Sequence, residues 1–397
     1  MDFRDVQWKY INEGNVHIVL QILNTDYVIR LVKEDGRAVN IEALREEIDF
    51  VNFVTAPLIC SSSQYRERLV EIIPDSLTVL SNDLNKIRPQ HRKTKSILSK
   101  YAIKAPNLTM IYENGVNYCL EIKPKEGIRF NKKLTRCYYC LKQYLKLHEN
   151  QITAVSNYCP MDLFSGDRKR MKIALQGLLD NPQNNFKIFK DGEIIYDEKS
   201  NILQLDVIIK NMHMFSSINL FLDFVIDMLL SDGKEDINTN ETEPVFLQTK
   251  NDKCIDNSQL MSNTFLYKLL FMQKLSENSA CIAEDIISDF DYVPRVLKEI
   301  KLQNFNLSIE SDSKKFLNST NPLYLNLISA VAKDCSIMIS FSSESVDRMP
   351  SVQVGSKKIS YRISVTDLEP KPASTLSKRT KTELKLLEIH DKYLGSA

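Results

Sequence analysis

Three charged segments of this chain carry the residue types that the transfer of a phosphoryl group requires. The first is Glu121 to Lys125, in which Glu121, Lys123 and Lys125 alternate and therefore project to one side of an extended backbone. The others are Asp334 and Asp367, each beside an apolar stretch that is typical of a β-strand. Phosphoryl transfer from ATP needs cations on the phosphates, Mg²⁺ held by acids, and an acid that orients the attacking hydroxyl. Each segment alone also fits a solvated edge strand or a turn aspartate, but their combination favours Asp334 as the base and Asp367 as a Mg²⁺ ligand.

The N-terminal part of the chain could provide the nucleotide side of such a site. A turn containing Gly14 precedes two predicted strands, 16–22 and 27–32, which the polar residues 24–26 join. Glycine allows the backbone to approach a ligand closely, and Arg30 on the second strand can reach phosphates. An ordinary hairpin and an exposed strand arginine explain the same residues. Apolar residues at helical spacing predict a helix over 40–54 after the hairpin.

Two basic runs indicate that the acceptor is a strong anion. The formal net charge is only +1, but 83–104 contains seven Lys or Arg against one acid, and 121–146 contains eight against two. Such runs are often solvated surfaces, yet two of them flanking the same motif favour a shared anion site. The composition, 43% hydrophobic and 26% charged, is that of a globular protein. With no membrane-length apolar run and no apolar signal core at the N-terminus, we expect a cytoplasmic and nuclear protein.

The eight cysteines do not resemble a disulfide framework in so long a chain, so we expect thiols or metal ligands. Cys137 and Cys140 are three residues apart, and Cys159 can fold back beside them. A zinc site and a group of buried thiols both remain open for these three residues.

The remaining pattern predicts an α+β fold. We expect helices at 134–149, 168–179, 265–275 and 293–300, mostly helix at 203–230, and a basic helix from residue 380. Strands are predicted at 117–123, 186–189, 194–196, 336–340 and 361–365. The polar segment 231–263 is predicted to be a flexible insertion.

At this point the chain resembles the inositol-pentakisphosphate 2-kinase family. Glu121 to Lys125 matches the ExKPK motif of that family, and further blocks match in the same order from about Trp8 to Pro372. These blocks are 158–166, 182–185, 332–339 and 367–372.

The resemblance implies a two-lobed kinase-like fold with an N-lobe over 1–115, built from an antiparallel sheet and a helix, and a larger C-lobe over 116–397 with an inositide-binding region. It also implies transfer of phosphate from MgATP to the 2-hydroxyl of inositol 1,3,4,5,6-pentakisphosphate, with inositol hexakisphosphate as the product. We expect a monomer that binds neither a membrane nor DNA.

The family's site residues carry over by motif. The implied catalytic residues are Asp334, Lys123 and Asp367. The implied nucleotide contacts are Gly14, Asn15, Val16, His17, Arg30, Asn107, Leu108, Thr109, Glu121 and Lys187. The implied contacts of the acceptor are Arg88, Arg92, Lys123, Lys125, Lys133, Arg136, Asn184 and Lys371. Animal members have cysteines like Cys137, Cys140 and Cys159, so the resemblance makes structural zinc an option there, with a fourth ligand unassigned.

The chain departs from the family at Glu369, where an aspartate is common. The alternative function is a non-catalytic module that binds inositol polyphosphates or RNA. Such a module has no need of Asp334 and Asp367, so their presence favours the enzyme. The absence of His-Arg-Asp and Asp-Phe-Gly motifs from the sequence disfavours a protein kinase.

Overall fold

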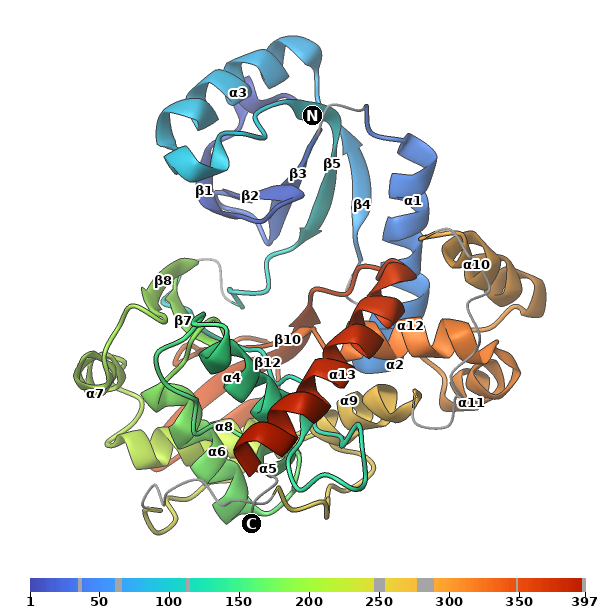
Figure 1. Cartoon of the computed structure of the whole chain (residues 1–397). Coiled ribbons are helices and arrows are strands. Elements are labelled where there is room, and N and C mark those ends of the chain that lie inside the picture. The colour runs from blue at the N-terminus through green and yellow to red at the C-terminus, as the bar shows by residue number, and fades with distance from the viewer. Residues whose placement is uncertain are drawn as a thin grey trace.

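The computed structural model of the chain describes residues 1–34, 38–60, 66–111, 115–245, 254–276, 289–347 and 349–394. The described residues form a mixed α+β structure built on two β-sheets. Figure 1 shows the N-terminal sheet at the top, with the second sheet and most helices below it. This arrangement confirms the α+β prediction.

The N-terminal sheet has the strand order β1-β2-β3-β5-β4, and all its neighbouring strands are antiparallel. The strands are β1 (Trp8–Glu13), β2 (His17–Ile22), β3 (Tyr27–Lys33), β4 (Arg68–Glu71) and β5 (Leu98–Pro106). β2 and β3 are the two strands predicted from the sequence. The turn between them includes Asn24 at φ 58°, a left-handed conformation that asparagine tolerates better than most residues.

Helices cover both faces of this sheet because side chains alternate along each strand. Leu31 of β3 packs in a cluster with Leu80 of α3 (Pro74–Ile87). The next residue, Val32, packs in a different cluster with Leu44 of α1 (Ile41–Phe50). Short 3₁₀ turns η1 (Phe3–Asp5) and η3 (Gln90–Arg92) complete this part of the chain.

Two segments connect the N-terminal sheet to the rest of the molecule. Helix α1 continues through a π-helical turn, η2 (Val51–Thr55), into α2 (Ala56–Cys60). Val51 and Val54 already belong to the larger, C-terminal core, and Thr55 Oγ1 donates to the carbonyl of Leu368 at 2.9 Å. The second connection is the chain that leaves β5 and enters β6. The N-terminal sheet is therefore attached to the larger core at two places far apart in the sequence.

The C-terminal sheet has the order β8-β7-β6-β10-β12-β11-β9. The strands are β6 (Tyr118–Ile122), β7 (Phe186–Lys190), β8 (Glu193–Tyr196), β9 (Ile237–Thr239), β10 (Ser336–Ser342), β11 (Ser351–Val354) and β12 (Lys357–Thr366). Only the pairing of β9 with β11 is parallel among these described strands. β10 lies in the middle and is buried at every residue, so the residues at its ends are fixed by the core.

The helices of this part surround the second sheet. They are α4 (Tyr138–His148), α5 (Pro160–Leu163), α6 (Arg168–Asp180), α7 (Ile202–Asn211), α8 (Ile218–Leu230), α9 (Phe265–Lys274), α10 (Tyr292–Gln303), α11 (Glu310–Ser319), α12 (Pro322–Ala332) and α13 (Ser374–Leu394). The predicted helix over 203–230 is divided between α7 and α8, with His213 at φ 57° between them. Helix α13 begins before the predicted residue 380 and packs along α4 through Leu141, Leu145, Leu386 and Ile389 (Figure 1). None of the described helices is long and apolar enough to span a bilayer.

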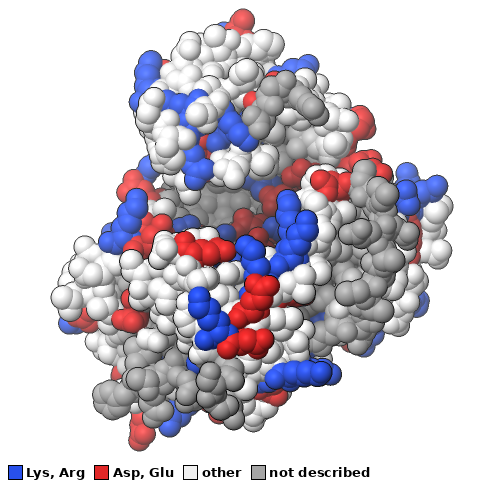
Figure 2. Space-filling model, viewed as in Figure 1, with Lys and Arg blue, Asp and Glu red and all other residues white. Residues whose placement is uncertain are grey.

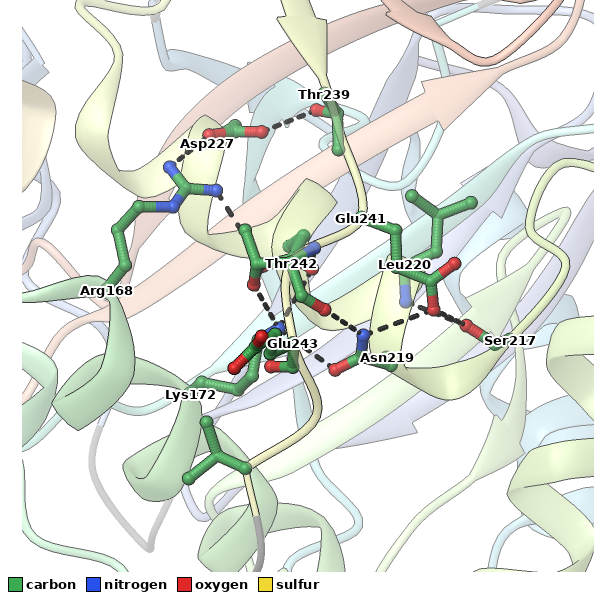
Figure 3. Close-up of polar contacts among 12 residues, drawn as sticks. Arg168, Lys172, Ser217, Asn219, Leu220, Asp227, Thr239, Glu241, Thr242 and Glu243 are labelled. Atoms are coloured by element: carbon green, nitrogen blue, oxygen red, sulfur yellow. Dashed lines mark hydrogen bonds and ion pairs between the residues drawn. The ribbon is translucent and has the colours of Figure 1, made fainter.

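Within 231–263, which the sequence predicts to be a flexible insertion, several described residues are held by contacts with the rest of the protein. β9 joins the sheet beside β11, and the residues after it are held by Lys172. The Lys172 side chain is only 1% exposed, and its Nζ lies 2.9 Å from Asp223 Oδ2 and 2.6 Å from Thr242 Oγ1 (Figure 3). A buried ammonium needs such partners, and Thr242 of the insertion supplies one of them. Residues 246–253 lie outside the described residues.

Candidate active site

Three neighbouring strands bring the predicted catalytic residues to one edge of the C-terminal sheet. β10 lies between β6 and β12 and is antiparallel to both, so its start lies opposite their ends. Asp334 comes just before β10, Lys123 just after β6 and Asp367 just after β12. The three residues are far apart in the sequence, and the register of the sheet places them together.

Lys123 and Asp367 form the centre of a polar network at this edge. Lys123 Nζ lies 3.0 Å from Asp367 Oδ2 and 4.0 Å from Glu121 Oε1. Ser336 Oγ lies 3.0 Å from the same Asp367 oxygen and 3.1 Å from Glu121 Oε1. Lys187 Nζ, from β7, donates to Glu121 Oε2 at 3.1 Å. Burial lowers the pKa of Lys123, but Asp367 outweighs it and raises the pKa above its usual value, so the lysine stays charged.

Asp334 lies between two lysines and is accessible to solvent. Its Oδ1 is 3.5 Å from Lys125 Nζ, and its Oδ2 is 3.1 Å from Lys371 Nζ. Desolvation raises the pKa of this carboxyl, but Lys125 and Lys371 more than compensate and hold it below its usual value. Asp334 is therefore ionised at neutral pH, as an acid that accepts a hydrogen bond from a hydroxyl must be.

The predicted nucleotide loop is a turn with an open outer side. Gly14 N donates to the carbonyl of His17 at 2.9 Å, and Lys33 Nζ donates to the carbonyl of Gly14 at 2.7 Å. A Cβ at Gly14 would meet no atom within 4 Å, and Val16 is 55% exposed. Asn15 Oδ1 accepts from Arg92 Nη1 at 3.2 Å, which places the Arg92 side chain beside this loop.

Arg30 connects the N-terminal sheet to the edge that carries the acids. Its guanidinium forms ion pairs with Glu67 and with Glu369, two residues after Asp367. Burial raises the pKa of Glu369, but Arg30, a backbone hydrogen bond and His17 together hold the pKa below its usual value. Burial and Arg30 lower the pKa of His17 to about 4, so its imidazole is neutral at physiological pH. The Arg30 cation and the neutral His17 ring therefore lie on the N-terminal side of the sheet edge that carries Asp367.

The residues predicted to contact the base of a nucleotide, Asn107, Leu108 and Thr109, lie on the connection from β5 to β6. Asn107 Oδ1 accepts from the backbone N of Thr109 at 3.1 Å and from its hydroxyl at 2.7 Å. Arg362 of β12 donates to the carbonyl of Asn107 at 2.8 Å, and Ser340 of β10 donates to that of Leu108. Two strands, β10 and β12, therefore fix this connection above the C-terminal sheet.

Arg88 and Arg136, predicted as contacts of acceptor phosphates, are not brought to the site. Arg88 has a side chain that is 1% exposed, and its guanidinium donates to both carboxylate oxygens of Glu13 at 2.9 and 2.8 Å. Arg136 is 2% exposed and lies 5.2 Å from the centre of the Tyr144 ring. In this structure Glu13, 75 residues away in the sequence, holds Arg88, and Arg136 is buried beside Tyr144. Their contacts with acceptor phosphates therefore stay predictions.

Among the other predicted acceptor contacts, Lys133 and Asn184 are exposed. The neighbour of Asn184, which the sequence did not single out, contacts the motif directly. The carbonyl of Asn185 accepts from the backbone N of Lys123 at 2.8 Å. The Asn-Asn block therefore supports the end of β6 through its backbone.

A basic groove between α4 and α13 was missed by the sequence analysis. It has a volume of about 430 Å³ and is lined by Lys142, Leu145, Lys146, Glu149, Gln151, Lys378, Lys381, Thr382 and Lys385. Burial is the main cause that holds the pKa of Lys125 below its usual value, and Lys123 and Lys142 add to it against the opposing effect of Asp334. Figure 2 shows a hollow below the N-terminal sheet with charged side chains at its walls, and further charged side chains over α13. Because the groove requires α13 to pack on α4, no single segment of sequence indicates it.

Four buried cysteines form the other notable cluster. Cys254, which the sequence did not identify, joins Cys137, Cys140 and Cys159, and all four sulfur atoms lie within 4.8 Å of one another. Cys254 Sγ is 3.6 Å from Cys159 Sγ and 3.8 Å from Cys140 Sγ. Four thiolates around a tetrahedral zinc, at about 2.3 Å each, would be about 3.8 Å apart. The geometry of the set therefore fits zinc, with Cys254 at the place of a fourth ligand.

The site as a whole combines ionised acids, cations on two sides and an exposed basic groove. That combination defines a phosphotransferase for an anionic acceptor. The chain belongs to the inositol-pentakisphosphate 2-kinase family, whose model matches residues 10–385.

Individual relatives agree with this assignment. The chain is 27% identical to the inositol-pentakisphosphate 2-kinase of Danio rerio, over 98% of this chain and 94% of the relative. It is 28% identical to that of Arabidopsis thaliana over 69% of this chain and 59% of the relative. A shorter match to that of Drosophila melanogaster is 43% identical over 18% of this chain and 11% of the relative.

Proposed function

We propose that this chain transfers the γ-phosphoryl group of ATP to the 2-hydroxyl of inositol 1,3,4,5,6-pentakisphosphate and so makes inositol hexakisphosphate. The observation that carries the proposal is Asp334, an ionised and accessible carboxylate between Lys125 and Lys371. An acceptor hydroxyl at Asp334 would have two cations beside it for the phosphates on neighbouring ring carbons.

Within this proposal the molecule is a two-lobed, kinase-like enzyme, with the nucleotide between the lobes. The Gly14–His17 turn, Arg30 and residues 107–109 would contact ATP from the N-terminal side, and Glu121 with Lys187 from below. Asp367 offers an oxygen for Mg²⁺, which neutralises the phosphates when bound. Lys123, 3.0 Å from Asp367, is placed to hold negative charge on the transferred group.

The acceptor would lie on the other side of Asp334 and extend into the groove between α4 and α13. A pentakisphosphate loses much hydration when it binds, so it needs several cations in fixed positions. Lys125 and Lys371 face the ring at the hydroxyl, and the groove offers Lys142, Lys146 and Lys381 further out. Asp334 accepts the proton of the 2-hydroxyl as the new bond to phosphorus forms.

We also propose that Cys137, Cys140, Cys159 and Cys254 hold a structural zinc ion. With four sulfur ligands and no open position, such an ion would contribute to folding and not to chemistry. Hydrogen bonding from Cys140 and burial raise the pKa of Cys137 well above its usual value, so without a metal its thiol stays neutral. The enzyme is further proposed to act as a monomer in the cytoplasm and nucleus.

The deciding experiment incubates the purified protein with MgATP and each inositol pentakisphosphate isomer and separates the products by chromatography. Only the isomer with a free 2-hydroxyl should give hexakisphosphate. Asp334→Asn should lower kcat about 100-fold or more, because the amide cannot accept the proton. Tight binding of the pentakisphosphate without any product would instead support a non-catalytic binding module.

A further inference from the structure

A fully buried glutamine links the two segments that carry Lys125 and Asp334. Gln273 lies near the end of α9 and is 0% exposed. Its Oε1 accepts from the backbone N of Gly127 at 2.8 Å, and its Nε2 donates to the carbonyls of Lys125 at 2.9 Å and Ala332 at 3.0 Å. The side-chain amide of Gln273 therefore forms three hydrogen bonds with backbone groups of the site, two as a donor and one as an acceptor.

The backbone that Gln273 holds on one side is in an unfavourable conformation. Lys125 has φ 57°, in the left-handed region, where the Cβ of an ordinary residue crowds the backbone. The segment is fixed further by Tyr158, whose hydroxyl donates to the carbonyl of Pro124 at 2.6 Å. At Gly127 a Cβ would lie 2.3 Å from the Phe164 ring, so only glycine fits. Strain of this kind persists where the surroundings enforce it, and it occurs most often at functional sites.

The segment on the other side leads directly to the proposed base. Ala332 is the last residue of α12, and Asp334 follows two residues later. The backbone N of Asp334 donates to the carbonyl of Val331 at 3.0 Å, so the position of Asp334 depends on how α12 ends. The Gln273 backbone takes part as well, because its carbonyl accepts from Ser329 Oγ of α12 at 2.7 Å.

We infer that Gln273 is a positioning residue that sets the distance between Lys125 and Asp334, and hence the placement of the acceptor hydroxyl against its neighbouring phosphate. This inference rests on the proposed function. The two side chains are 3.5 Å apart across the site, and Gln273 is bonded to the backbone behind both. Gln273 itself touches neither of these side chains. Its effect on the reaction would therefore pass through the left-handed backbone at Lys125.

The first test compares Gln273→Met with the wild type. Methionine keeps the volume of the side chain but loses all three hydrogen bonds. We expect the KM for the pentakisphosphate to rise about tenfold and kcat to fall, with the KM for ATP within about twofold of the wild type. The control is Gln176→Met on α6, since Gln176 also donates to a backbone carbonyl, that of Val245 at 2.7 Å. This control should change thermal stability at most and neither KM.

The second test uses Gln273→Glu and remains informative if the methionine variant does not fold. Burial and two facing carbonyls would raise the pKa of the new carboxyl, and its protonated form can still donate one hydrogen bond and accept another. Activity of Gln273→Glu relative to the wild type should therefore fall as the pH rises. If Gln273→Met folds, its activity relative to the wild type should not depend on pH.

Two outcomes would overturn the inference while leaving the proposed function intact. One is a folded Gln273→Met protein with wild-type kinetics and only a lower Tm. The other is a Gln273→Glu protein whose relative activity is the same at every pH. A wild-type protein without activity on the pentakisphosphate would instead refute the proposed function.

Discussion

Arg379 of α13 and Glu126 of the loop after β6 form a bidentate ion pair. Arg379 Nη1 lies 3.1 Å from Glu126 Oε1, and Nη2 lies 2.9 Å from Oε2. Glu126 is almost fully buried directly after Lys125, while Arg379 follows Lys378 of the basic groove. The pair therefore joins the helix that lines the groove to the loop that carries the acceptor-side lysine.

Removing one partner of this pair should destabilise the fold. Arg379→Ala would leave the carboxylate of Glu126 buried, and we expect a loss of about 3 kcal/mol in the free energy of unfolding. The double variant Glu126→Gln with Arg379→Met should lose clearly less, because it removes both charges of this ion pair and leaves no buried carboxylate at position 126. Urea unfolding followed by circular dichroism measures both.

The exposed pair Lys314 and Glu310 on α11 gives the matched control, with side chains 68% and 81% exposed. Lys314→Ala should change the stability by less than about 0.5 kcal/mol. If Arg379→Ala were no more destabilising than this control, the pair would not anchor α13.

The pH dependence of the reaction should move when a lysine beside Asp334 is neutralised. Burial raises the pKa of Asp334, but Lys125 and Lys371 help to hold it below its usual value, so the wild-type base stays ionised to lower pH than an ordinary aspartate. Lys371→Met removes that charge, and the Asp334 pKa should rise. The acid limb of kcat/KM should then lie at higher pH than in the wild type.

The substrate's phosphates also titrate near pH 6, but they are the same for both proteins. A difference between the pH profiles of kcat/KM for the wild type and for Lys371→Met therefore reports on the titration of a group of the enzyme and not of the substrate. An acid limb that does not move between wild type and Lys371→Met would show that Asp334 is not the group that must be ionised.

The sequence predicted which residues lie together best where those residues stand at the ends of strands. Asp334, Asp367 and Lys123 each end or begin a recognisable strand, and pairing of those strands suffices to bring them together. Arg88 could not be placed in the same way, because its partner Glu13 is 75 residues away and lies on another strand. A cationic residue in a basic run looks the same in sequence whether its guanidinium faces a ligand or a buried carboxylate.

Packing between distant segments explains the other missed features. Cys254 lies within 231–263, the segment that was predicted to be a flexible insertion, and its nearest cysteine neighbour in the sequence among the four is 95 residues earlier. The groove lysines lie on α4 and α13, whose contact depends on Leu141, Leu145, Leu386 and Ile389. Sequence periodicity identifies the apolar face of each helix but not which other helix it meets.

Lysines of the groove should contribute to binding of the acceptor and not of ATP. Lys146→Met or Lys381→Met should raise the KM for the pentakisphosphate about tenfold, because each removes a cation from a site for a dense polyanion. The KM for ATP should stay within about twofold of the wild type. Raising the salt concentration should weaken binding of the acceptor less in these variants than in the wild type.

Lys210 on α7 provides the control for the charge change. It pairs with Asp206 at 2.5 Å on the helix surface and is 61% exposed. Lys210→Met should leave both KM values unchanged. Equal effects of Lys146→Met on both substrates would place the groove outside the acceptor site.

Loss of one cysteine ligand should release the metal and destabilise the protein. The purified wild type should contain about one zinc per chain, and Cys254→Ser should contain much less and unfold at a lower temperature, because a hydroxyl is a poor replacement for a thiolate. Prolonged treatment with a strong chelator should lower the Tm of the wild type and change that of Cys254→Ser little. Cys60→Ser, a cysteine outside the group of four, should keep its zinc. Elemental analysis measures the zinc content of the wild type, Cys254→Ser and Cys60→Ser. Full zinc content in Cys254→Ser would exclude Cys254 as the fourth ligand.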